Sequence, residues 1–109
     1  MFELVKGSPK YRRYLPATLY TTIWNLVELY AVVRRHFDQE QARRQFARFR
    51  GLAVDTPDDL LREAMELKAA QARLSYADAI GYTAARRLGA RFLTGDPAFR
   101  KMPDVEFRP

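Results

Sequence analysis

The sequence contains no cysteine and only one histidine among its 109 residues. The lack of cysteine excludes disulfides, thiol chemistry and cysteine-based zinc sites, and a single histidine excludes a histidine-rich metal centre. His36 follows Arg34 and Arg35 at the expected end of a helix. It is interpreted as a solvated residue near a helix C-terminus rather than a catalytic one.

Long hydrophobic runs are also absent. No apolar stretch approaches the roughly 20 residues of a membrane-spanning helix, and no signal peptide is visible. Hydrophobic residues make up 48% of the chain, which is ordinary for a globular protein. Without repeats, low-complexity tracts or linkers, residues 1–109 are predicted to form one soluble, cytoplasmic domain with a modest core.

Acidic residues are in the minority, with 13 Asp and Glu against 19 Lys and Arg, for a net charge of +6. A basic balance favours polyanionic partners such as RNA, but basic proteins from hot environments show it without binding nucleic acid. Residues 10–14 (KYRRY) interleave basic and aromatic side chains. They could contact phosphate and stack a nucleobase, or equally form a solvated turn whose tyrosines pack on the core.

The order of predicted elements indicates an α/β fold. Helical periodicity and capping residues alternate with short apolar, β-branched segments, which is typical of a parallel sheet covered by helices on both faces. Strands are predicted at residues 17–23, 51–54, 91–94 and 105–107, and helices at residues 25–36, 39–50, 57–72, 75–88 and from 97.

Two carboxylates stand at predicted helix starts. Ser75 followed by Asp78 is a capping pair, and Asp96 stands at the N-cap of a short helix whose first residue is Pro97. The helix macrodipole keeps such carboxylates ionised, and ionised carboxylates are the ligands that hard divalent cations need. Taken alone, each acid is explained more simply as a helix cap.

Glu28 strengthens the case for a metal site. It lies with Asn25 in the otherwise apolar residues 23–33, where an ionised carboxylate is costly unless it is paired, capped or bound to metal. Asn25 is predicted as an N-cap and Glu28 as its capping partner, so a purely structural role is open here too. We nevertheless expect Glu28, Asp78 and Asp96 to converge where ligands bind α/β sheets, outside the carboxyl ends of the strands.

Three segments together resemble a known family: residues 25–30 (NLVELY), 74–79 (LSYADA) and 93–99 (LTGDPAF). In this order they are similar to a PIN domain of the VapC toxin type, and the resemblance covers nearly the whole chain. It implies a PIN-like three-layer fold and a metal-dependent endoribonuclease, the toxin of a VapBC-type toxin–antitoxin system. It also implies Mg²⁺ or Mn²⁺ as cofactor, RNA as substrate, a VapB-like antitoxin as partner and a homodimer. By this resemblance Glu28, Asp78 and Asp96 are metal-site acids and Thr94 is a supporting hydroxyl.

The resemblance also predicts a missing element. Members of the family open with a central strand that ends in an aspartate, followed by a helix that residues 2–7 (FELVKG) resemble. Residues 1–6 are therefore predicted to be helical, with the first strand and its aspartate absent through an N-terminal truncation. The sheet is expected to show a vacancy or an abnormal pairing in that central place, because an unpaired buried strand edge is costly.

The missing aspartate leaves a second function class open. The chain could be a catalytically impaired, PIN-like module that binds RNA or an antitoxin without cutting. The helix at residues 39–50 carries Ala42, Phe46 and Phe49 on one stripe. These side chains are more often core than contact surface, yet a basic helix with such a stripe could dock a second copy or an antitoxin helix.

Overall fold

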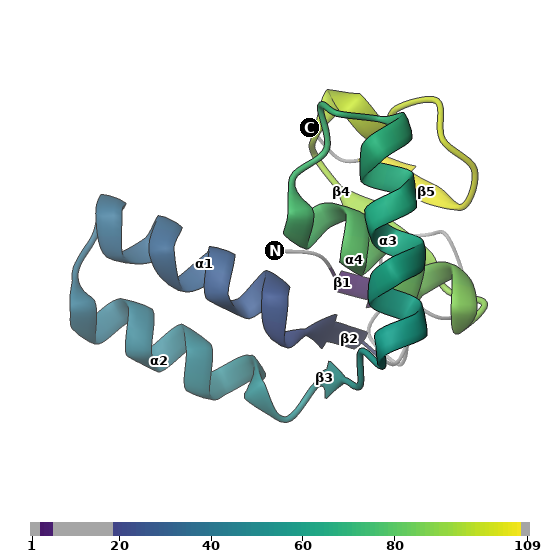
Figure 1. The fold of residues 1–109 in the computed structure, drawn as a ribbon. Coiled ribbons are helices and arrows are strands. Elements are labelled where there is room, and N and C mark those ends of the chain that lie inside the picture. The colour runs from purple at the N-terminus through teal and green to yellow at the C-terminus, as the bar shows by residue number, and fades with distance from the viewer. Residues whose placement is uncertain (1–2, 6–18, 108–109) are drawn as a thin grey trace.

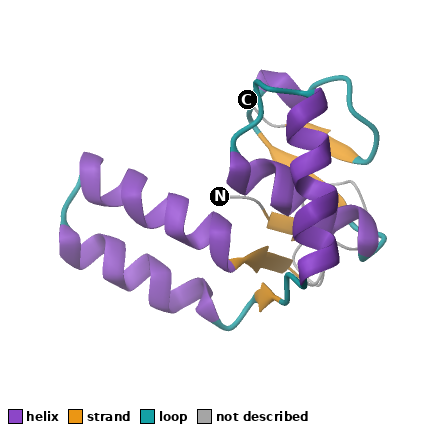
Figure 2. Ribbon diagram, viewed as in Figure 1, coloured by secondary structure: helices purple, strands orange, loops and turns teal. Residues whose placement is uncertain are grey.

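The computed structural model describes residues 3–5 and 19–107 of the chain (Figure 1). Strands and helices are mixed along the sequence, as Figure 2 shows, so the predicted α/β class is confirmed. The strands are β1 (Glu3–Val5), β2 (Leu19–Thr22), β3 (Ala53–Val54), β4 (Arg91–Thr94) and β5 (Val105–Phe107). The helices are α1 (Ile23–His36), α2 (Gln39–Arg50), α3 (Asp58–Ala70), α4 (Tyr76–Arg87) and the 3₁₀ turn η2 (Pro97–Phe99).

The five strands form one sheet in the order β3-β2-β1-β4-β5. The two outer pairs, β2 with β3 and β4 with β5, are parallel, as the sequence predicts. The central strand β1 runs antiparallel to both of its neighbours, β2 and β4. The sheet is therefore mixed, and the prediction of a wholly parallel sheet is wrong at its centre.

β1 also corrects the prediction of a helix at residues 1–6. Leu4 is opposite Tyr20 of β2 on one side and Phe92 of β4 on the other. A strand between β2 and β4 supplies hydrogen-bond partners to the backbone of both strands, which would otherwise be unpaired there. The free energy gained from this pairing exceeds the weak helix preference of residues 1–6. The central place in the sheet is thus filled, and the vacancy expected there is not observed.

The start of α1 differs from the prediction as well. Thr22, not Asn25, is the N-cap, with extended backbone angles and a hydroxyl that accepts the Asn25 N–H at 3.2 Å. β2 ends where α1 begins, so the predicted strand 17–23 is longer than the observed one. Glu28 consequently lies in the second turn of α1 and is not a capping partner. The idea that all three acids lie at or just inside a helix N-terminus is wrong for Glu28.

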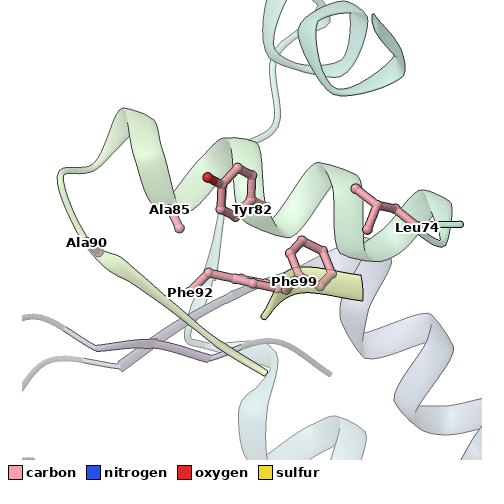
Figure 3. Packing of buried hydrophobic residues seen from close by; sticks show 6 residues of the cluster. All are labelled: Leu74, Tyr82, Ala85, Ala90, Phe92 and Phe99. Atoms are coloured by element: carbon pink, nitrogen blue, oxygen red, sulfur yellow. The ribbon is translucent and has the colours of Figure 1, made fainter. Parts of the chain in front are cut away.

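Aromatic packing between α4, β4 and η2 forms the centre of the larger core cluster. Figure 3 shows Tyr82 and Phe99 facing one another above Phe92 of the sheet. The Phe92 and Phe99 ring centroids lie 4.8 Å apart, and Tyr82 meets Phe92 edge-on at 5.9 Å. Such pairs add to simple apolar burial. Because η2 directly follows Asp96, this core fixes the segment that carries Asp96.

A second cluster joins α3 to α4. Leu60 and Ala64 of α3 pack against Ala79 and Ile80 of α4, and all four side chains are buried. Helix α4 ends after Arg87, close to the predicted end. Gly89 follows with a positive φ of 65°, a backbone conformation that favours glycine. α4 is thereby held between the sheet and α3, with its N-terminal turn in a fixed place.

α1 and α2 form a hairpin that extends away from the sheet (Figure 1). Ala42 of α2 is fully buried, and Phe46 meets Tyr30 of α1 edge-on with ring centroids 6.2 Å apart. His36, the last residue of α1, is exposed, as expected for a solvated histidine. In the part of the chain that the structure describes, no helix is long and apolar enough to cross a membrane.

Candidate functional site

Asp78 lies in the first turn of α4, where the sequence predicts it. Ser75 is the N-cap, and its hydroxyl accepts the Asp78 N–H at 3.0 Å. Because Ser75 already caps the helix, the Asp78 carboxylate is not needed as a cap and is available for other interactions. The side chain is half-buried.

Asp96 is the N-cap of η2, which confirms the second predicted cap. One carboxylate oxygen accepts the Ala98 N–H at 2.9 Å, and Pro97 occupies the first position of the turn. The Thr94 hydroxyl accepts the Asp96 N–H at 3.0 Å. Thr94 therefore fixes the backbone that carries Asp96, and the second carboxylate oxygen is not committed to the cap.

Glu28 reaches the same region from α1. Its half-buried side chain lines a hollow together with Ser75 and Ala77, which flank the start of α4. The second turn of α1 thus lies beside the first turn of α4. Glu28 therefore lies in the neighbourhood of Asp78. This holds although the N-cap of α1 is Thr22 and not Asn25, from which the position of Glu28 was predicted.

The charges of Glu28 and Asp96 act on Asp78. The pKa of the Asp78 carboxyl is raised above its ordinary value, chiefly because burial withdraws water from the charged form. The negative charges of Glu28 and Asp96 raise it further, while the hydrogen bond from Ser75 opposes the change. Asp78 therefore lies close enough to both other acids to be repelled by them.

Five acidic side chains elsewhere among the described residues form ion pairs with arginine, whereas Asp38, Asp55, Asp58 and Glu66 form none. Arg87 of α4 contacts Asp59 at 2.6 Å, and similar pairs occur at other surface positions. Within residues 3–5 and 19–107, no basic side chain forms an ion pair with Glu28, Asp78 or Asp96 either. Carboxylates that lack a basic side-chain partner within the described ranges are donors that a divalent cation can use.

The carboxylates do not form a closed coordination shell. Among the described residues, no group of three or more His, Asp or Glu side chains lies close enough together to hold a metal ion. Magnesium usually keeps several of its waters and takes only one or two protein carboxylates directly. Any cation held by these acids would therefore have to be bound in part through water.

Asn25 is a residue of this region whose role the sequence did not reveal. It is fully buried, and its side-chain amide donates to the Ala77 carbonyl at 3.2 Å while its oxygen accepts the Thr22 hydroxyl at 2.5 Å. Asn25 thus ties the start of α1 to the residue directly before Asp78. The only local signal was its position as a polar residue in an apolar run.

Residues 10–14, predicted either to contact RNA or to form a solvated turn, lie outside the described part of the chain. The family model of the PIN domain matches residues 1–105. Searches of curated proteins and of solved structures give no significant match.

Proposed function

We propose that this chain, which belongs to the PIN domain family, is a metal-dependent endoribonuclease. PIN domains are generally nucleases and generally use divalent metal ions. The observation that carries the proposal for this chain is the raised pKa of Asp78 beside Glu28 and Asp96. A carboxylate whose pKa is raised by burial and by neighbouring acids is characteristic of a functional site, because a stable fold gains nothing from such repulsion.

In this proposal Glu28, Asp78 and Asp96 hold Mg²⁺ or Mn²⁺, directly or through water. The cation would supply charge to offset the negative charge that builds up on the phosphate and would lower the pKa of a water nucleophile. The Thr94 hydroxyl positions Asp96 by accepting the backbone N–H of Asp96. The hydroxyl proton of Thr94 remains available to orient a water or a carboxylate. Asn25 positions the first turn of α4, from which Asp78 projects.

The proposal includes a cytoplasmic role as the toxin of a VapBC-type toxin–antitoxin system, with a VapB-like antitoxin and a second copy of the chain as partners. The α1–α2 hairpin supports it. A hollow of about 430 Å³ between these helices is lined by Leu29, Val33, Phe37 and Phe49, and Phe37 is 74% exposed. An apolar groove between two helices is a surface on which an amphipathic helix can dock.

A second function is favoured by one observation. The described residues contain no ready three-ligand metal group, which is what a catalytically impaired module that binds RNA or an antitoxin would show. The two functions differ in their need for the charge of the acids, because binding RNA to a basic protein does not require ionised carboxylates.

Asp96→Asn separates the two functions. The variant keeps an oxygen that can cap η2 but loses the charge, so folding should persist while metal-dependent cleavage of a single-stranded RNA falls about 100-fold or more. Loss of an outer-shell partner alone typically costs about 10- to 100-fold. The matched control is Asp38→Asn, because Asp38 caps α2 in the same way, with its carboxylate accepting the Gln41 N–H at 2.7 Å, and is exposed.

The assay measures cleavage in Mg²⁺, in Mn²⁺ and in excess chelator. Cleavage by wild type and Asp38→Asn that stops in chelator, with loss in Asp96→Asn, supports the nuclease. Full activity of Asp96→Asn or activity in chelator would refute the metal mechanism. RNA binding without cleavage in either metal would establish the module instead.

A further inference from the structure

Two aromatic side chains stand exposed next to Glu28, on the opposite sides of one groove. Trp24 comes from the first turn of α1 and Tyr76 is the first residue of α4, and they are 43% and 65% exposed. The groove between the two helices has a volume of about 460 Å³ and is also lined by Val27 and Lys68. This volume lies within the range of about 300–1,000 Å³ typical of sites for small organic groups.

Two of the polar groups that line this groove, on Trp24 and Lys68, have partners within the protein. The Trp24 indole N–H donates to the Thr56 hydroxyl at 3.1 Å, which fixes the orientation of the ring. The Lys68 ammonium lies 4.8 Å from the centre of the Tyr76 ring and donates to the Ala72 carbonyl. The groove thus offers two aromatic surfaces, that of Trp24 held in place by a hydrogen bond, with a cation at its rim.

We propose that this groove binds an unstacked base of single-stranded RNA, with the base against Tyr76 and Trp24. The inference rests on the proposed function and adds a base-binding subsite beside Glu28. A base in the groove would bring its phosphate close to Glu28, which lines the same hollow, and Lys68 would complement the phosphate charge. Single-stranded RNA is recognised by stacking on aromatic side chains combined with basic groups.

The single tryptophan of the chain allows a direct measurement. An oligoribonucleotide of about ten nucleotides, a length typical of single-strand binding sites, is titrated in excess chelator so that it is not cut. Binding in the groove should quench the fluorescence of Trp24. A double-stranded RNA of the same sequence should quench it less, because its bases are not available for stacking.

Variants identify the stacking residue. Tyr76→Ala should weaken binding of the single strand about tenfold, within the range known for loss of one aromatic–base stack, and Tyr76→Phe should restore it. Leu88→Ala is the control, since Leu88 is an exposed apolar side chain at the opposite end of α4 from Tyr76. Lys68→Gln should reduce the salt dependence of binding by the equivalent of roughly one phosphate contact.

The outcomes separate this inference from the proposed function. Quenching of Trp24 with the predicted Tyr76 effects but no cleavage in metal would support the groove and refute the nuclease. Metal-dependent cleavage with unchanged RNA affinity in Tyr76→Ala would overturn the groove alone. If Tyr76→Ala instead converts a dimer to a monomer in sedimentation and leaves RNA affinity unchanged, the groove is a contact between copies of the chain and the inference is wrong.

Discussion

The pKa of the Asp78 carboxyl is raised by burial and by repulsion from Glu28 and Asp96. The folded protein therefore binds a proton at this position more tightly than the unfolded chain does. Stability from Asp78 is fully present below its unfolded pKa and is lost as the pH rises through its folded value. At neutral pH the charge of Asp78 thus opposes folding, as expected for a functional carboxylate.

Asp78→Asn should accordingly raise the melting temperature at pH 7 without metal, by about 2 to 5 °C on the scale of a domain of about 100 residues. The stability gain of Asp78→Asn should shrink as the pH falls through 3.8, the ordinary pKa of an aspartate, because Asp78 then takes up a proton in the unfolded state as well. Thermal unfolding followed by circular dichroism between pH 3.5 and 7 measures this difference in melting temperature between wild type and Asp78→Asn. Asp55→Asn, at an exposed loop position, controls for the loss of one negative charge.

Magnesium provides the second half of this test. A cation that binds the folded wild type stabilises it by mass action, so added Mg²⁺ should narrow the gap between wild type and Asp78→Asn. A variant that is no more stable than wild type at pH 7 would show that the charge of Asp78 does not oppose folding.

At the scale of elements, Asn25 joins α1 to α4. Its amide donates to the carbonyl of Ala77, a residue 52 positions away in the sequence, and its oxygen accepts the Thr22 hydroxyl. Both partners are on helix termini, so one buried side chain sets the relation between the two helices that carry Glu28 and Asp78. A buried hydrogen-bonded amide of this kind is costly to remove.

Asn25→Ala should lower the free energy of unfolding by about 1–3 kcal/mol, the usual cost of leaving buried polar partners unsatisfied. Urea denaturation measures this change. Gln39→Ala removes an exposed amide from α2 and should be nearly neutral. An unchanged urea midpoint in Asn25→Ala would mean that α1 and α4 are held together without this bond.

Local signals account for what could be predicted among these elements. Ser75 and Asp96 were identified as caps because a cap is decided by a few adjacent residues, and α2 was predicted at its observed bounds from its periodicity. The cap of α1 was misplaced because Thr22 and Asn25 are both good capping residues. The bond from Asn25 to α4 has no local signature at all.

The sheet as a whole shows the limit of such reasoning. The outer strand pairs follow from apolar segments that alternate with helices. β1 is three residues long, and nothing in its letters distinguishes it from a helical turn. Its conformation is set by two neighbours, β2 and β4, that are distant in sequence and require a partner between them.

The antiparallel pairing of β1 can be tested with engineered cysteines, because the native chain has none. Leu4 is opposite Tyr20 in the register, and opposed residues of an antiparallel pair have Cβ atoms about 4.5–5.5 Å apart on one face of the sheet. The double variant Leu4→Cys, Tyr20→Cys should therefore form an intramolecular disulfide under mild oxidation. Leu4→Cys with Leu19→Cys should not, since adjacent residues of a strand point to opposite faces. Equal cross-linking of both pairs, scored by mass spectrometry, would contradict a fixed central strand in this register.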